Sequence, residues 1–178
     1  HSLTPRLFTL VGEHLRMDEV IPIFLEARGI DEFTSLVGDL EGEVWFSCTA
    51  PLKHSPQSRL GVRGPEGVNA INQLRRKDGV WSGVSTDGVG FVAACRHIGI
   101  EPSGCVLRIR GGGSAARAIA AAWADEGGLI IAEEGRRPLV SGPWDSAIIE
   151  NGDAVIGIDL DTAPAGGESA TLDAEMQV

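Results

Sequence analysis

Residues 106–132 (VLRIRGGGSAARAIAAAWADEGGLIIA) decide the fold of this chain. Residues 106–109 are a short, largely apolar run that predicts a buried strand, and three glycines follow that run closely. The alanine-rich residues 114–126 predict a helix, and the apolar residues 129–132 predict a second strand. A strand, a helix and a second strand within about 30 residues make a βαβ unit with parallel strands. The sequence therefore predicts an α/β fold.

The glycines of this unit are spaced as in a dinucleotide-binding turn. Gly111, Gly113 and Ala116 match the pattern Gly-x-Gly-x-x-Ala between a strand and a helix. Backbone N–H groups and the start of the helix can bind a pyrophosphate there. The predicted cofactor contacts in this turn are Gly111, Gly112, Gly113, Ser114 and Ala115. The alternative interpretation is a glycine loop that serves only the fold.

Residues after the second strand bear on which dinucleotide could bind. Glu134 could accept hydrogen bonds from ribose hydroxyls and would repel a 2′-phosphate, which favours NAD. Arg136 and Arg137 would attract that phosphate, which favours NADP. From these residues alone both cofactors stay open.

Further elements are predicted on both sides of the βαβ unit. Before it we predict a helix over residues 5–15 capped by Thr4, an edge strand over 20–25 interrupted by Pro22, a short helix capped by Asp31, a buried strand over 43–48, a hairpin of 70–76 and 80–85, and a helix over 88–99. After it we predict a helix over 144–150, a parallel strand over 154–158, and a loop or disorder from 161 to the end.

Composition restricts the class of partner. The chain has 178 residues, and 15 Lys and Arg against 25 Asp and Glu give a formal net charge of -10. Such a charge repels a phosphate backbone and an anionic bilayer, so neither nucleic acid nor a membrane is expected as a partner. The apolar helical run 118–124 is far shorter than the roughly 20 residues that span a membrane. We expect a soluble, cytoplasmic protein with a small-molecule substrate, as a monomer or a homodimer.

The chain has 3 cysteines and 4 histidines, and their spacing suggests neither a metal site nor a disulfide framework. We therefore expect no metal, and we interpret Cys48, Cys95 and Cys105 as small buried side chains.

Lys53 and Asp87 are the candidate residues for proton transfer. Lys53 ends a Thr-x-Pro-x-Lys turn directly after the predicted strand 43–48. A lysine beside an aspartate in a partly desolvated cleft can move a proton to or from a reacting hydroxyl. Spacing alone favours the alternative, two solvated surface charges. Ser2 and Thr4 flank a helix start, where a substrate carboxylate could bind, although Thr4 could simply cap the helix.

Four short segments, in this order, resemble the active-site motifs of shikimate dehydrogenases. They are residues 1–5 (HSLTP), 49–53 (TAPLK), 70–74 (AINQL) and 85–91 (STDGVGF). The resemblance implies an N-terminal α/β substrate-binding domain over residues 1–88, an inter-domain helix and linker over 89–104, and an incomplete Rossmann-type NAD(P)-binding domain over 105–178. It also implies that the family's first strand and C-terminal helices are missing from this sequence.

The resemblance assigns roles to individual residues. It implies that Lys53 and Asp87 are catalytic. Substrate contacts are implied for Ser2, Thr4, Ser47, Thr49, Asn72 and Asp87. The implied activity is NADP-dependent interconversion of 3-dehydroshikimate and shikimate, or of a related ring acid such as quinate, in aromatic amino acid biosynthesis through chorismate. Family precedent favours NADP over NAD.

The sequence also departs from the family pattern. Ser47 and Ser85 stand where the family has asparagine, and the chain contains no tyrosine. Shorter hydroxyls in place of two amides would alter recognition of the ring hydroxyls. An alternative is therefore a diverged relative that binds a carboxylate or a nucleotide without turnover. A dehydrogenase of another Rossmann family is a third interpretation.

Overall fold

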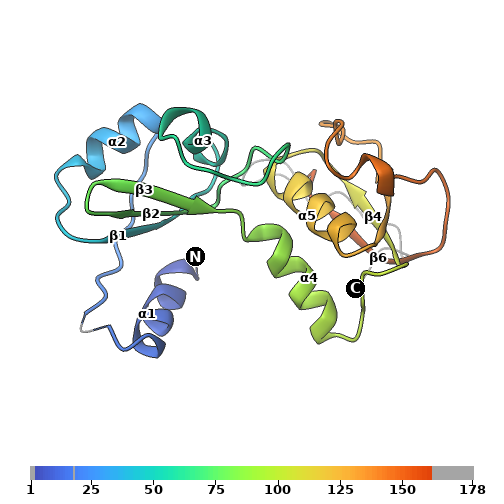
Figure 1. Ribbon diagram of the computed structural model, residues 1–178, viewed down its shortest axis with the longest axis horizontal. Helices are drawn as coiled ribbons and strands as arrows, with labels where there is room; N and C mark the ends of the chain where they lie inside the picture. The colour runs from blue at the N-terminus through green and yellow to red at the C-terminus, as the bar shows by residue number, and fades with distance from the viewer. Residues whose placement is uncertain (1–2, 18, 162–178) are drawn as a thin grey trace. The chain divides into compact units, whose positions relative to one another are not determined.

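The computed structural model describes residues 3–17 and 19–161 of the chain. The chain divides into two compact units, His1–Gly42 and Glu43–Val178. The first unit contains two helices, and the second contains two three-stranded sheets with the remaining helices (Figure 1). The predicted α/β class is confirmed, because one of these sheets is parallel and carries helices. No helix among the described residues is long and apolar enough to cross a membrane.

Both helices predicted in the first unit are present, as α1 (Thr4–His14) and α2 (Ile30–Gly38). The two predicted caps are wrong, because each helix begins earlier than predicted. Thr4 already lies inside α1, and no side chain caps that end. Pro5 fits the first turn, so the helix can begin one residue before it. Asp31 lies in the first turn of α2, where its carboxylate interacts favourably with the helix dipole.

Residues 20–25 form no strand, so the edge strand predicted there is wrong. No strand of the described chain pairs with this segment. Pro22 has no N–H group to donate to a ladder, and Ile21, Ile23 and Phe24 are exposed. An apolar run forms a stable strand only when a neighbouring strand completes its hydrogen bonds.

An antiparallel sheet opens the second unit. It consists of β1 (Val44–Ser47), β2 (Gln73–Lys77) and β3 (Val80–Val84), in the order β1-β2-β3. Asp78 and Gly79, with φ values of 50° and 75°, form the turn of the predicted hairpin. The strand predicted as buried is an edge strand, and Trp45 in it is 45% exposed. The register pairs Ser47 with Gln73 and Gln73 with Val84, so the end of β1, the start of β2 and the end of β3 lie together.

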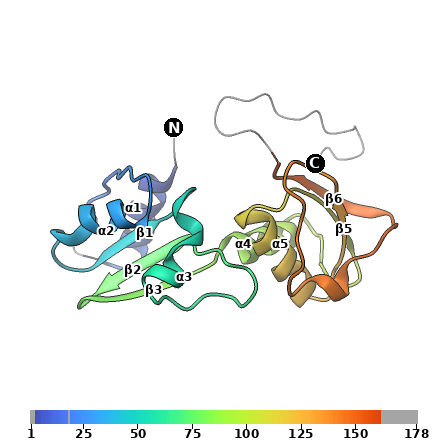
Figure 2. The ribbon, with the colours of Figure 1, turned by 90° about the horizontal axis from the view of Figure 1, so that it is seen from above.

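The predicted βαβ unit is confirmed. It consists of β4 (Val106–Arg110), α5 (Ser114–Asp125) and β5 (Leu129–Glu133). With β6 (Ala154–Asp159) the strands form a parallel sheet in the order β5-β4-β6. Leu107, Ile109, Trp123 and Ile130 are fully buried in the core of this part of the unit. Two views show α5 alongside the parallel strands and α4 (Asp87–His97) beside α5 (Figures 1 and 2).

The helix predicted over residues 144–150 is reduced to a single 3₁₀ turn, η2 (Asp145–Ala147). Its neighbours are extended instead, because their backbone pairs with β5. Ile148 forms a parallel bridge with Ile130, and the Ile149 N–H donates to the Ile130 carbonyl oxygen. Long-range strand pairing therefore overrides the local helical pattern. The segment from residue 162 onward, predicted as loop or disorder, lies outside the described residues.

Gly88 allows α4 to pack closely against α5. A Cβ atom on Gly88 would lie 2.1 Å from the carbonyl oxygen of Ala118. We expect Gly88→Ala to lower the free energy of unfolding by about 1–3 kcal/mol through overpacking. Gly90→Ala in the same helix is the matched control, because a Cβ atom there meets nothing within 4 Å. Its better helix propensity should raise stability by up to about 1 kcal/mol. Urea unfolding compares the two variants, and equal stabilities would contradict this packing.

Candidate active site

Lys53 and Asp87 form an ion pair in the second unit. Lys53 lies in η1 (Leu52–His54), the 3₁₀ turn that follows β1, and Asp87 is the first residue of α4. The Lys53 Nζ atom lies 2.5 Å from the Asp87 Oδ2 atom, and the two side chains are 19% and 22% exposed. This arrangement is a close, partly desolvated pair of opposite charges that a substrate could still reach.

Asn72 fixes the orientation of Asp87. This side chain is 7% exposed, and its Nδ2 group donates to the Asp87 Oδ1 atom and to the Thr86 Oγ1 atom, both at 2.8 Å. Its Oδ1 atom accepts a hydrogen bond of 2.6 Å from the Thr86 N–H group. Only an oxygen can accept that bond, so the orientation of the amide is fixed. Asp87 is therefore held at Oδ1 by Asn72 and presents Oδ2 to Lys53.

Backbone hydrogen bonds join the segments that carry these side chains. The Ile71 N–H donates to the Lys53 carbonyl oxygen at 2.9 Å, and the Cys48 N–H donates to the Asn72 carbonyl oxygen at 2.7 Å. The Asn72 N–H donates to the Val84 carbonyl oxygen at 3.2 Å. The three-stranded sheet therefore brings together Lys53, Asn72 and Asp87, three of the predicted site residues, although they come from three different segments.

The other predicted substrate contacts of this sheet are less tightly held. The Ser47 hydroxyl accepts a hydrogen bond of 3.3 Å from the Gln73 side-chain amide. Thr49 is exposed, and its hydroxyl lies 3.4 Å from the Ala50 carbonyl oxygen. The Ser85 hydroxyl oxygen is buried and has no hydrogen-bond partner among the described residues. These hydroxyls occupy two positions at which the sequence departs from the family pattern and one at which it follows it.

Cys48 adjoins this site, and its thiol is unreactive. Burial raises the pKa of the Cys48 thiol to about 11, and the positive charge of Lys53 only partly opposes this shift. The thiol therefore stays protonated near neutral pH and is a poor nucleophile. This supports the interpretation of Cys48 as a small buried side chain.

The described residues do not test the predicted carboxylate-binding residues, Ser2 and Thr4. Ser2 lies outside the described residues, and Thr4 belongs to the first unit whereas Lys53 and Asp87 belong to the second. The roles of Ser2 and Thr4 therefore stay predictions.

The domain boundaries at residues 88 and 104 also stay predictions.

The glycine turn lies between β4 and α5. Gly111 has a φ of 108°, which a residue with a side chain rarely adopts. A Cβ atom on Gly112 would lie 1.9 Å from the Pro138 carbonyl oxygen, so the loop after β5 passes directly over this residue. Gly113 precedes α5, and a Cβ atom there would meet nothing within 4 Å. The turn is thus open at Gly113, beside the N-terminal end of the helix.

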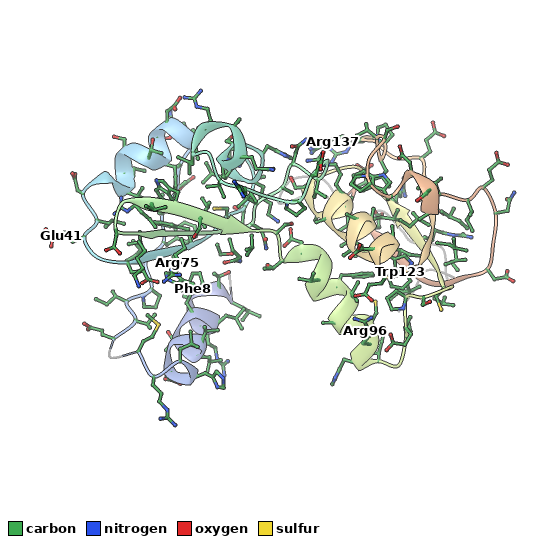
Figure 3. All side chains as sticks on the ribbon, viewed as in Figure 1. Phe8, Glu41, Arg75, Arg96, Trp123 and Arg137 are labelled. Atoms are coloured by element: carbon green, nitrogen blue, oxygen red, sulfur yellow. The ribbon has the colours of Figure 1, made fainter. Side chains whose placement is uncertain are left out.

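The loop after β5 carries the predicted cofactor-selecting residues. Strand β5 ends at Glu133, one residue before the predicted Glu134, and Glu134 is exposed. The Asp161 carboxylate accepts a hydrogen bond of 2.5 Å from the Arg136 N–H group, and this bond holds the pKa of Asp161 below its usual range. Arg137, labelled in Figure 3, is exposed, and its carbonyl oxygen would lie 3.0 Å from a Cβ atom on Gly112.

His54 and Arg117 lie near this turn and were not predicted as site residues from the sequence. His54 directly follows Lys53, and its ring lies within hydrogen-bond distance of both Ser114 and Arg117 of α5. The sequence shows that His54 adjoins the predicted proton-transfer residue and that Arg117 follows the glycine turn, but nothing local to either segment indicates that the two side chains meet. Among residues 3–17 and 19–161, no group of three or more His, Cys, Asp or Glu residues could hold a metal ion.

The sequence of this chain is similar to those of curated shikimate dehydrogenases. No protein-family model matches it. A curated protein of Bacillus cereus, named shikimate dehydrogenase (NADP(+)), is 36% identical over 131 residues, which cover 71% of this chain and 47% of that protein. The chain belongs to the shikimate dehydrogenase family. It spans about half the length of the curated relatives that it matches.

Solved structures of shikimate dehydrogenases share its fold. A shikimate 5-dehydrogenase of Listeria monocytogenes, solved in complex with shikimate and NAD, is 28% identical, with a TM-score of 0.59 over 74% of this chain and 46% of that chain. A shikimate 5-dehydrogenase of Thermus thermophilus, solved with NADP(H) and shikimate, is 25% identical, with a TM-score of 0.57 over 74% of this chain and 50% of that chain. The family resemblance inferred from the four motifs is confirmed.

Proposed function

We propose that this chain catalyses the NADP-dependent interconversion of 3-dehydroshikimate and shikimate, or of a related hydroxylated ring acid such as quinate. The observation that carries the proposal is the Lys53–Asp87 pair, with its 2.5 Å contact and partial burial. The names of the relatives support the same reaction class.

The proposed chemistry divides the oxidation of a ring hydroxyl between two acceptors. When bound, NADP⁺ supplies the acceptor for the hydride that leaves the ring carbon. The ammonium of Lys53 first releases a proton to solvent; the hydroxyl proton then passes to the neutral Lys53 amine, and the carbon–oxygen bond becomes a carbonyl. Asp87 stabilises the resulting ammonium through its Oδ2 atom. In the reverse direction the Lys53 ammonium donates its proton to the carbonyl oxygen.

The residues of the glycine turn fit a dinucleotide. Gly111 adopts the left-handed conformation of such a turn, and the space beside Gly113 leaves backbone N–H groups at the start of α5 able to bind a pyrophosphate. The Glu133 Oε1 atom lies 3.6 Å from the Arg108 Nη1 atom, and the Arg136 Nε atom lies 3.7 Å from the Asp161 Oδ1 atom. The carboxylate of Glu133 and the guanidinium of Arg136 therefore already have partners of opposite charge. We assign the 2′-phosphate of NADP to the exposed Arg137.

For the substrate we propose that Ser2 and Thr4 bind the carboxylate, and that Ser47 and Thr49 contact ring hydroxyls. Asn72 uses both amide hydrogens on Thr86 and Asp87. We therefore assign it mainly to orienting Asp87, rather than to donating a hydrogen bond to the substrate.

A second candidate function is a relative that binds a ring acid or a nucleotide without turnover. Ser85 favours it, because its buried hydroxyl, which has no hydrogen-bond partner among the described residues, stands where the family has an amide. A site that loses such a hydrogen bond can lose several orders of magnitude in discrimination between substrates.

Steady-state assays of the purified chain separate the two functions. Shikimate and quinate are each tested with NADP⁺ and NAD⁺ by following nicotinamide reduction. We expect turnover with shikimate, and a higher kcat/KM with NADP⁺ than with NAD⁺. If a folded sample gives no reduction with any of the four pairs, yet is thermally stabilised by shikimate or NADPH, the binding function replaces the enzymatic one.

A further inference from the structure

Arg117 binds four acceptors, none of them a carboxylate. Its Nε group donates to the Val68 carbonyl oxygen at 2.8 Å, and its Nη1 group donates to the Gly112 carbonyl oxygen at 3.2 Å. Its Nη2 group donates to the Asn69 carbonyl oxygen at 3.3 Å and lies 3.1 Å from the His54 Nδ1 atom. Burial lowers the pKa of Arg117, and none of the salt bridges found among the described residues involves it.

His54 connects the turn that follows β1 with helix α5. A guanidinium N–H can only donate, so the Arg117 contact needs an unprotonated Nδ1 atom. The same Nδ1 atom lies 3.3 Å from the Asn69 carbonyl oxygen, a contact that needs a protonated Nδ1 atom, so one tautomer makes only one of these two hydrogen bonds. The Ser114 hydroxyl lies 3.2 Å from the Nδ1 atom and 3.1 Å from the Nε2 atom. Ser114 is 9% exposed and is the first residue of α5. The ring of His54 thus contacts two side chains, Ser114 and Arg117, of the helix that follows the glycine turn.

This cluster joins the glycine turn to the segment of Lys53. Arg117 holds the carbonyl of Gly112 in the turn, and also the ring of His54, the residue next to Lys53. The other side of that segment is fixed by the hydrogen bond from the Ile71 N–H to the Lys53 carbonyl oxygen. Two side chains therefore connect the predicted pyrophosphate turn with the predicted proton-transfer residue.

We propose that His54 and Arg117 are positioning residues that hold the glycine turn and Lys53 in one fixed geometry. This inference rests on the proposed function. Hydride and proton must leave neighbouring atoms of one substrate, so a small shift between the cofactor turn and Lys53 slows the reaction. The planar fork of arginine suits this role because it binds several acceptors at fixed angles, which a lysine cannot do.

The test changes a residue in one segment and measures the function assigned to the other segment. A variant beside Lys53 is tested for NADPH binding, and a variant beside the glycine turn is tested for turnover. His54→Leu removes both ring nitrogens from the Lys53 segment, and we expect the Kd of NADPH, measured by its fluorescence, to rise about tenfold. His54→Asn can keep an acceptor near the place of Nδ1 and should restore most of the affinity. Arg117→Lys, in the helix after the turn, should lower kcat about tenfold at saturating NADP⁺ and shikimate.

Matched controls come from α4. His97→Leu and Arg96→Lys make the same chemical changes in exposed residues, and Arg96 pairs there with Glu101 and Glu126 (Figure 3). Neither control should change the Kd of NADPH or kcat. In the double variant of His54→Leu and Arg117→Lys, the loss of NADPH affinity should be smaller than the sum of the single losses, because both remove one interaction.

The inference is overturned if His54→Leu leaves the Kd of NADPH within about twofold, if His54→Asn restores nothing, or if the two substitutions are additive. Should Arg117→Lys not fold, as judged by circular dichroism, Ser114→Ala replaces it, because it removes only a hydroxyl. About a threefold fall in kcat at saturating NADP⁺ and shikimate is then expected, and an unchanged kcat contradicts the inference. A wild-type chain that turns over no ring acid contradicts the proposed function, whereas the NADPH-binding comparison still tests the positioning cluster.

Discussion

Replacing Lys53 by methionine is expected to lower kcat for shikimate oxidation by a factor of about 10²–10⁴, because no other group replaces its proton transfer. Methionine keeps much of the length of the side chain but cannot accept the hydroxyl proton. The Kd of NADPH should change little, since the glycine turn is untouched. Stopped-flow and steady-state measurements of nicotinamide reduction give kcat, and fluorescence titration gives the Kd.

The matched control is Lys77→Met. Lys77 is an exposed lysine in β2 whose Nζ atom lies 3.6 Å from Glu43. This substitution makes the same chemical change on the same sheet without touching Asp87, so kcat should stay within about twofold of the wild-type value. If Lys53→Met retained the wild-type kcat while Lys77→Met also did, the proposed proton transfer would be wrong.

Replacing Asn72 by alanine is expected to reduce both stability and turnover. The substitution removes three hydrogen bonds and leaves the Thr86 N–H group and the Asp87 Oδ1 atom without their partner. We expect the free energy of unfolding to fall by on the order of 3 kcal/mol, because the unpaired groups are partly buried. We expect kcat to fall about tenfold or more in the fraction that remains folded, since Asp87 is no longer oriented.

Two comparisons separate these effects. Asn151→Ala, in an exposed loop, is the control for stability and should change the free energy of unfolding by less than about 0.5 kcal/mol. Asn72→Asp keeps the acceptor for the Thr86 N–H group but places a second carboxylate against Asp87, so kcat should fall even if the fold is kept. Urea unfolding and initial rates are measured on all three variants. An Asn72→Ala variant with wild-type stability and kcat would show that this hydrogen-bond network does not support the site.

Local patterns predicted most of the elements of this chain. The βαβ unit over residues 106–132 and the hairpin around Asp78 and Gly79 are confirmed, because glycine positions and apolar periodicity act within a few residues. The predicted pairing of Lys53 with Asp87 also agrees with the geometry. It came from the family resemblance, because spacing alone favoured two solvated surface charges.

The wrong predictions concern features that depend on distant residues. Residues 20–25 are a continuous apolar run broken by Pro22, but they have no neighbouring strand in the described chain. Residues 144–150 look helical, yet Ile148 and Ile149 pair with β5. The contacts of His54 with Arg117 join residues 63 positions apart, so neither segment alone indicates them. The orientation of Asp87 by Asn72 likewise depends on the register of the antiparallel sheet.

The most direct test of the central claim follows the hydride itself. Shikimate carrying deuterium on the carbon of the oxidised hydroxyl is incubated with the purified chain and NADP⁺, and the reduced nicotinamide is analysed by mass spectrometry. The proposed function predicts deuterated NADPH from the wild-type chain, and far less of it from Lys53→Met in the same time. If a folded wild-type chain forms no deuterated NADPH while it binds NADPH, the assignment of this Lys53–Asp87 site to ring-acid oxidation is contradicted.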